Sequence, residues 1–375
     1  MPKLIKNREF ILVVVFALLT AILCFIPTNF DDRVADNAVR CKAEVIAVDN
    51  VEIQQFGMVK TGPQSVTLKI LEGKFKDQVM KGTNEMLGQM DKDKIFEVGD
   101  YALTVLSLNS EGEVIYVNPQ DHYRIGTEFA LVGLFAFLLI VFGGWTGAKA
   151  LFSFLFTALA IWKLLIPGLL MGVDPVLITL ALVTALCAVI IFMVAGLNKK
   201  GIVAFIGSFL GIFTSCLLAV YFTGDLHLHG AVMPFAETLL YSGFGHLDLT
   251  KIYVAAVFLA CSGAVMDLAM DVSVSLDEVV RINPEITRLE VLASGLRVGR
   301  AVVGTMTTTL LLAYSGGFVT LLMAFMAQGV PLINTFNFVY VSAEVLKTLV
   351  GSFGLVTVAP FTAVVGAFVF SKSKK

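Results

Sequence analysis

The strongest constraint on the fold is the nearly continuous apolar sequence that begins at about Glu128. A helix needs about 20 predominantly apolar residues to cross the hydrocarbon core of a bilayer, and it satisfies its own backbone hydrogen bonds there. Polar residues and proline or glycine breaks divide this region into segments of roughly that length. These segments centre on residues 128–144, 150–168, 175–196, 202–223, 252–274, 297–315 and 345–370. We therefore predict an all-α polytopic membrane domain.

The N-terminus adds one more predicted span. Its basic start and the apolar run that ends at Ile26 are typical of a signal peptide, but no small-x-small cleavage site follows, which favours an uncleaved helix. About eight transmembrane helices result. Residues 318–346 are mixed in character and predict a re-entrant hairpin or an interfacial helix. With 57% hydrophobic and 15% charged residues, the composition excludes a soluble globule.

A polar region separates the first predicted helix from the others. Short alternating apolar runs at residues 43–48, 66–71 and 101–106 predict strands, and glycine-bearing segments such as Gly73 to Gly82 predict turns. We predict a small β-rich barrel or sandwich. The predicted domains are an anchor helix (1–29), the β-rich domain (30–127) and a multi-span domain (128–375).

Lysine and arginine in the short loops predict the orientation of the spans. Most of them fall on one side of an eight-span arrangement, and this side is expected to be cytoplasmic. Both termini would then be cytoplasmic in a cell membrane, and residues 30–127 extracytoplasmic. The formal net charge of −2 gives no reason to expect a nucleic-acid partner.

Two carboxylates in one apolar helix are the leading candidate site. Asp267 and Asp271 are four residues apart, so a helix places both on one face. An ionised group in hydrocarbon costs roughly 2.5 kcal/mol or more, so such groups tend to face a bundle interior, form pairs or carry protons. If the next helix is antiparallel, Arg300 lies at a similar depth and is a candidate partner for Asp271.

Hydroxyl groups continue from Arg300 along the same helix at Thr305, Thr308 and Thr309. A carboxylate, a guanidinium and a row of hydroxyls form a plausible proton path, because hydroxyls both donate and accept hydrogen bonds. The alternative is a static tie between helices, with each threonine bonded to a carbonyl of its own helix. Glu344 and Lys347 are expected to pair along the last helix.

Other chemistry has little support in the sequence. His227, His229 and His246 share one loop, but their loose spacing favours solvated residues over a metal site. We expect no metal and no other cofactor. No nucleophile stands beside a base in a recognisable spacing, so we do not expect an enzyme.

Three segments resemble the YibE/F family of bacterial membrane proteins. They are SGAVMDLAMDVSVS, VGRAVVGTMTTTLLLAYSGG and GSFGLVTVAPFTA. The phrases at residues 62–65 and 98–100 are also similar to that family. The resemblance implies the architecture of a multi-pass membrane protein and no defined activity.

A second and more distant resemblance is to SecF, a relative of the proton-driven RND membrane proteins. It covers about a quarter of the chain. The similar positions are Asp271 to Asp277, Arg281 to Asn283, Gly299 to Ala301, Thr307 and Thr308, Tyr314, Gly316 and Gly317, and the last helix. This resemblance implies a SecF/RND-like C-terminal core in which Asp271 and Arg300 serve a proton pathway. The role of Asp267 is left open.

These observations predict a proton-coupled transporter or an export-assisting protein. The alternative is a non-transporting membrane scaffold or sensor whose outer domain binds a partner. The expected partners are the lipid bilayer, an unknown substrate, and either a second copy of the chain or a paired membrane protein.

Overall fold

The computed structural model describes residues 2–28, 30 and 37–371. The chain divides into two compact units. One comprises Met1–Thr28 and Ile140–Lys375, and the other comprises Asn29–Leu139.

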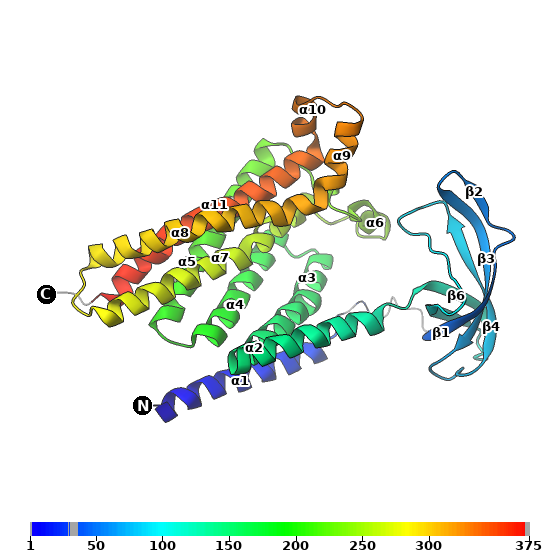
Figure 1. Ribbon diagram of the computed structural model, residues 1–375, viewed down its shortest axis with the longest axis horizontal. Coiled ribbons are helices and arrows are strands. Elements are labelled where there is room, and N and C mark those ends of the chain that lie inside the picture. The colour runs from blue at the N-terminus through cyan, green and yellow to red at the C-terminus, as the bar shows by residue number, and fades with distance from the viewer. Residues whose placement is uncertain (1, 29, 31–36, 372–375) are drawn as a thin grey trace. The chain divides into compact units, whose positions relative to one another are not determined.

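The Asn29–Leu139 unit contains one antiparallel sheet (Figure 1). Its strands are β1 (Ala38–Asp49), β2 (Gln54–Phe56), β3 (Val59–Ile70), β4 (Val79–Leu87), β5 (Tyr101–Leu108) and β6 (Val114–His122). The order is β2-β3-β1-β5-β6, and β4 pairs with β3. The strands predicted at residues 43–48 and 101–106 are confirmed within β1 and β5, and the strand predicted at 66–71 is confirmed in β3 as far as Ile70, where β3 ends.

Alternating side chains build the core of this sheet. Val66, Leu68 and Ile70 of β3 are fully buried, and the polar residues between them are less buried, as the period of two requires. The prediction that Gly73 to Gly82 form only a turn is wrong at its end, because β4 begins at Val79 and includes Gly82. The sequence signal was weak here because residues 79–87 carry few large apolar side chains at alternate positions.

A buried polar group also belongs to this core. The side chain of Gln64 has no exposed surface, and its Nε2 donates to the Phe96 carbonyl at 2.9 Å and to Asn50 Oδ1 at 2.8 Å. Its Oε1 accepts from the Phe96 N–H and from Asn84 Nδ2, both at 3.0 Å. The nitrogen and the oxygen of the Gln64 amide therefore both bind the backbone of Phe96 and attach this loop to the sheet.

The other unit is helical. Its first helix, α1 (Pro2–Phe25), packs against α4 (Pro175–Ala195) through a cluster that includes Leu23, Phe156 and Leu186. Lys163 Nζ donates to the carbonyl of Ile26 at 3.1 Å. Lys163 lies in η2 (Ile161–Leu165), a π-helical turn between α2 (Ile125–Ala160) and α3 (Ile166–Leu170).

Within the described residues, six helical segments are long and apolar enough to cross a membrane. The first, Ile125–Leu170, has 46 residues and would be about 69 Å long as one helix, which exceeds the roughly 30 Å hydrocarbon core. Gly144, with φ 53° and ψ −129°, breaks its helical geometry. The predicted spans at 128–144 and 150–168 meet at this break. The count of eight spans is not confirmed and stays a prediction.

Four long helices of the helical unit pack against one another (Figure 1). They are α5 (Lys199–Asp225), α7 (Leu249–Ile282), α8 (Arg288–Ser315) and α11 (Val339–Phe370). Small residues allow close packing among them. A Cβ added to Gly211 of α5 would lie 2.8 Å from Val265 of α7 and 2.9 Å from Val358 of α11. Helices in a membrane associate through such close packing, because the burial of apolar groups alone gives little driving force for association there.

Short helices connect the long ones. The loop after α5 contains η3 (Gly230–Val232) and α6 (Ala236–Tyr241). The mixed segment at residues 318–346 forms η4 (Gly316–Phe318), α9 (Val319–Ala327) and α10 (Leu332–Asn337), with a turn at Gly329 between α9 and α10. The structure thus makes this segment a pair of short helices followed by the first residues of α11, which begins at Val339.

Candidate functional site

The two predicted carboxylates lie near the middle of α7. This helix has 34 residues, and Asp267 is close to its midpoint, with Asp271 about one turn further on. Asp248 caps the N-terminus by accepting from the Lys251 N–H at 3.0 Å. A long apolar helix, capped at its start by Asp248, therefore carries both aspartates near its middle.

Both aspartates lie on a narrow exposed line of an otherwise enclosed helix. α7 packs against α4, α5, α8 and α11, and most of its side chains are buried or half-buried. Its exposed positions between residues 256 and 278 recur every three or four residues, which is one helical face. We name this line the α7 seam. It consists of Ala256, Ala260, Gly263, Asp267, Asp271, Val274 and Glu278.

The neighbouring helix brings Arg300 to the depth of Asp271. A Cβ added to Gly299 of α8 would lie 2.6 Å from Ala359 Cβ of α11 and 3.9 Å from Val272 Cγ2 of α7. Arg300 follows Gly299, and Asp271 precedes Val272. The two charged residues therefore share one level of the bundle.

Although Asp271 and Arg300 lie at the same depth, they do not form an ion pair. Arg300 is exposed, and among the described residues no ion pair within 4.0 Å connects it to either aspartate. Arg300 shares a helical face with Tyr314, about four turns later. The Tyr314 ring lies 4.9 Å from Lys347 Nζ of α11, so this face is the α11 flank of α8. The helical phase of Arg300 directs it to that flank.

The threonine row bonds within its own helix. Thr305 donates to the Val302 carbonyl at 2.9 Å, and Thr309 donates to the Thr305 carbonyl at 3.0 Å. Thr308 donates to the Gly304 carbonyl at 3.3 Å. All three threonines are exposed. These bonds agree with the local arrangement that the sequence left open as an alternative, and the proton relay stays a prediction.

The predicted pair in the last helix is confirmed. Lys347 Nζ lies 3.1 Å from Glu344 Oε1, and both side chains are half-buried. Tyr314 completes this group through its contact with Lys347. A hollow of about 250 Å³ lies beside them, lined mainly by apolar residues of α8, α9, α10 and α11. This hollow could not be predicted from the sequence, because its walls come from separate helices that only the fold brings together.

The loop histidines do not form a cluster with other ligands. His227 Nδ1 lies 3.0 Å from the Asp225 carbonyl, and His246 Nε2 lies 3.3 Å from the Leu170 carbonyl. Across the described ranges, no group of three or more His, Cys, Asp or Glu side chains could hold a metal ion. The candidate site therefore rests on the carboxylates of the α7 seam.

A family model described as YibE/F-like protein matches residues 131–372, which is more than half of the chain. The chain belongs to the YibE/F-like family. The match includes α7, α8 and α11, and hence both aspartates and Arg300 of this YibE/F-like protein. It does not include the β-rich strands, which end at His122. No curated protein and no solved structure matches the chain.

Proposed function

We propose that this YibE/F-like membrane protein couples proton movement to transport or export, with Asp267 and Asp271 as the proton-carrying groups. The observation that carries the proposal is the α7 seam, where two carboxylates stand near the middle of a membrane helix that is otherwise enclosed. Such groups are costly at membrane depth and commonly mark ion or proton pathways.

The position of the carboxylates suggests how protonation would act on the helices. The neutral acid is less costly to expose to hydrocarbon than the carboxylate is. Protonation therefore allows the α7 seam to contact hydrocarbon that the ionised seam would avoid. α7 contacts α4, α5, α8 and α11. A small change in the surroundings of the α7 seam therefore affects all four of these helices. Arg300 at the same level supplies a positive charge that an ionised Asp271 would approach after a modest movement of α8.

The proposed topology places this movement in a cell membrane. The break at Gly144 supports two passes within residues 125–170, which together with α1 would give eight spans with both termini in the cytoplasm. In this arrangement the β-rich domain is extracytoplasmic. The proposed partners are a substrate and a second membrane chain, and no catalysis of covalent chemistry is proposed.

Proton flux into liposomes tests the function. Purified wild type, Asp267→Asn and Asp271→Asn are reconstituted with a pH-sensitive dye inside and a pH gradient imposed. Glu278→Gln is the matched control, because Glu278 lies on the same seam but near the end of α7, where it pairs with Arg281 at 2.6 Å.

We expect flux in the wild type and in the control, and flux at the level of protein-free liposomes in the Asn variants. Thermal unfolding verifies that all four proteins are folded. Equal flux in all four contradicts the assignment of the carboxylates.

A scaffold or sensor is the second candidate function. It is favoured by the extended polar strands of the β-rich unit, which leave a hollow between two sheet edges. A scaffold predicts that the Asn variants change the abundance of the protein in the membrane and leave proton flux at background in every variant, including the wild type.

A further inference from the structure

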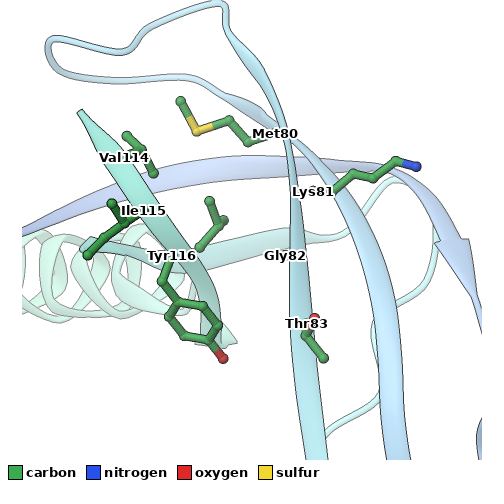
Figure 2. A pocket seen from close by; sticks show the side chains of 8 residues that line it. Met80, Lys81, Gly82, Thr83, Val114, Ile115 and Tyr116 are labelled. Atoms are coloured by element: carbon green, nitrogen blue, oxygen red, sulfur yellow. The ribbon is translucent and has the colours of Figure 1, made fainter. Parts of the chain in front are cut away.

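The hollow beside the Glu344–Lys347 pair lies in the helical unit and has a volume of about 250 Å³. A cavity of about 150 Å³ in another protein binds benzene, so in proportion this hollow holds about ten non-hydrogen atoms. The hollow between β4 and β6 of the β-rich unit (Figure 2) is narrowed at one level, because a Cβ added to Gly82 would lie 2.7 Å from the Val117 carbonyl oxygen. The hollow of the helical unit therefore has the better room for a small ligand.

Contacts between the short helices and α11 hold the walls of this hollow in place. Residues of α8, η4, α9, α10 and α11 line it. The ring of Phe325 in α9 lies 5.0 Å from the ring of Phe338, the residue that precedes α11. Ser342 of α11 donates to the Phe336 carbonyl of α10 at 2.9 Å. These contacts fix α9 and α10 against the start of α11, so the hollow is formed before a ligand arrives.

The lining is mostly apolar and carries one charged group. Its polar members are Tyr314, Ser315, Glu344 and Thr348, and among the described residues that line it only Glu344 is charged. Lys347 does not line the hollow, but its Nζ donates to both Glu344 carboxylate oxygens, at 3.1 and 3.4 Å. A ligand in the hollow therefore meets a carboxylate whose charge is already balanced from behind.

This charge balance selects the class of ligand. A cationic ligand would leave an excess positive charge beside Lys347, and an anionic ligand would face the carboxylate of Glu344. Both arrangements are costly where water is scarce. A neutral hydroxyl group adds no charge and donates a strong hydrogen bond to a carboxylate. The apolar lining favours hydrocarbon for the rest of the ligand.

We propose that this hollow binds a neutral apolar molecule of about ten non-hydrogen atoms whose single hydroxyl group donates to the Glu344 carboxylate. Leu311 and Leu349 line the hollow and are exposed, so the hollow is open on a side of the bundle that faces hydrocarbon in a membrane. A molecule of this class dissolves in the bilayer and can enter from there. This inference goes beyond proton coupling and does not depend on it.

The test uses the full chain in lipid nanodiscs and a nine-carbon primary alcohol that carries a photoreactive diazirine in its chain. After irradiation, mass spectrometry locates the labelled peptides. Unlabelled 1-nonanol, nonylamine and nonanoate compete at equal mole fractions in the lipid. These three competitors share one chain length, and at about pH 8.5 the amine is cationic and the acid is anionic.

We expect label within residues 311–322 and 336–349, which contain the lining residues. Competition by 1-nonanol should be at least about fivefold stronger than competition by the amine or the acid. Label in these segments that 1-nonanol does not displace would mean that bulk lipid fills the hollow. Equal competition by all three compounds would remove the role of charge balance. Either result would overturn the proposal.

Val345→Trp fills the hollow, and Val356→Trp is its matched control. The two valines lie on one face of α11, about three turns apart, and are 38% and 50% exposed, but only Val345 lines the hollow. We expect Val345→Trp to lower the labelling at least about fivefold, and Val356→Trp to stay within about twofold of the wild type. Equal labelling of the two variants contradicts the site.

Glu344→Gln tests the charge balance itself. This variant leaves the Lys347 cation without its carboxylate, so nonanoate should now compete at least as well as 1-nonanol. An unchanged preference for 1-nonanol over nonanoate contradicts the assigned role of Glu344. Proton flux separates this inference from the proposed function. Val345→Trp is expected to leave flux unchanged, and Asp271→Asn is expected to leave the labelling unchanged.

Discussion

Replacing Gly299 with alanine tests whether close contact between α8 and α11 sets the position of Arg300. The added Cβ would lie 2.6 Å from Ala359 Cβ. Carbon atoms in ordinary contact are about 3.5 to 4.0 Å apart, so the two helices would have to separate by about 1 Å. Overpacking of this kind costs about 1 to 3 kcal/mol. Alanine is more favourable than glycine in a helix by about 0.5 to 1 kcal/mol, and this gain offsets part of the cost. The net loss of unfolding free energy should be up to about 2.5 kcal/mol.

Gly304→Ala is the matched control on the same helix. A Cβ at Gly304 meets nothing within 4 Å, so this variant gains helix stability and loses no packing. Both variants are purified in one detergent and unfolded by heat, followed by circular dichroism. We expect Gly299→Ala to melt below the wild type and Gly304→Ala to melt at or above it. If Gly299→Ala is as stable as Gly304→Ala, the close contact does not determine the packing of α8.

Two further predictions concern the β-rich unit, and hydrogen exchange of the full chain checks both. Gln64→Leu should lower the stability of β3 by about 2 to 4 kcal/mol, because the buried Phe96 N–H and carbonyl lose their partner, whereas exposed Gln55→Leu should change it little. The N–H groups of Leu87, Gln89 and Gly88 lower the pKa of Asp93, with Leu87 the largest cause. Ionised Asp93 therefore stabilises the folded state at pH values above the ordinary carboxyl pKa. This stabilisation is lost as the pH falls through the lower pKa of the folded state. The stability difference between wild type and Asp93→Asn should be constant near neutral pH and shrink in acid below about pH 4; a difference that grows in acid would contradict this assignment.

Local patterns predicted much of the architecture. The apolar segments at residues 175–196 and 202–223 correspond closely to α4 and α5, because a membrane helix must satisfy its backbone within a single segment. Alternation predicted β3 for the same kind of local reason. β4 was missed because Gly82 reads as a turn residue. Only its contact with Val117, from a distant strand, shows why a glycine is needed there.

The sequence by itself determined the helical spacing of Asp267 and Asp271 and their place in an apolar segment, since both depend only on the 3.6-residue period and on composition. Only the tertiary structure decided which face of α7 stays exposed, because that depends on how α4, α5, α8 and α11 pack around it. It also decided that Arg300 lies level with Asp271 without pairing to it. The contact at Gly299 sets the depth of Arg300 in the bundle. The rotation of α8 about its own axis sets the direction in which the Arg300 side chain points.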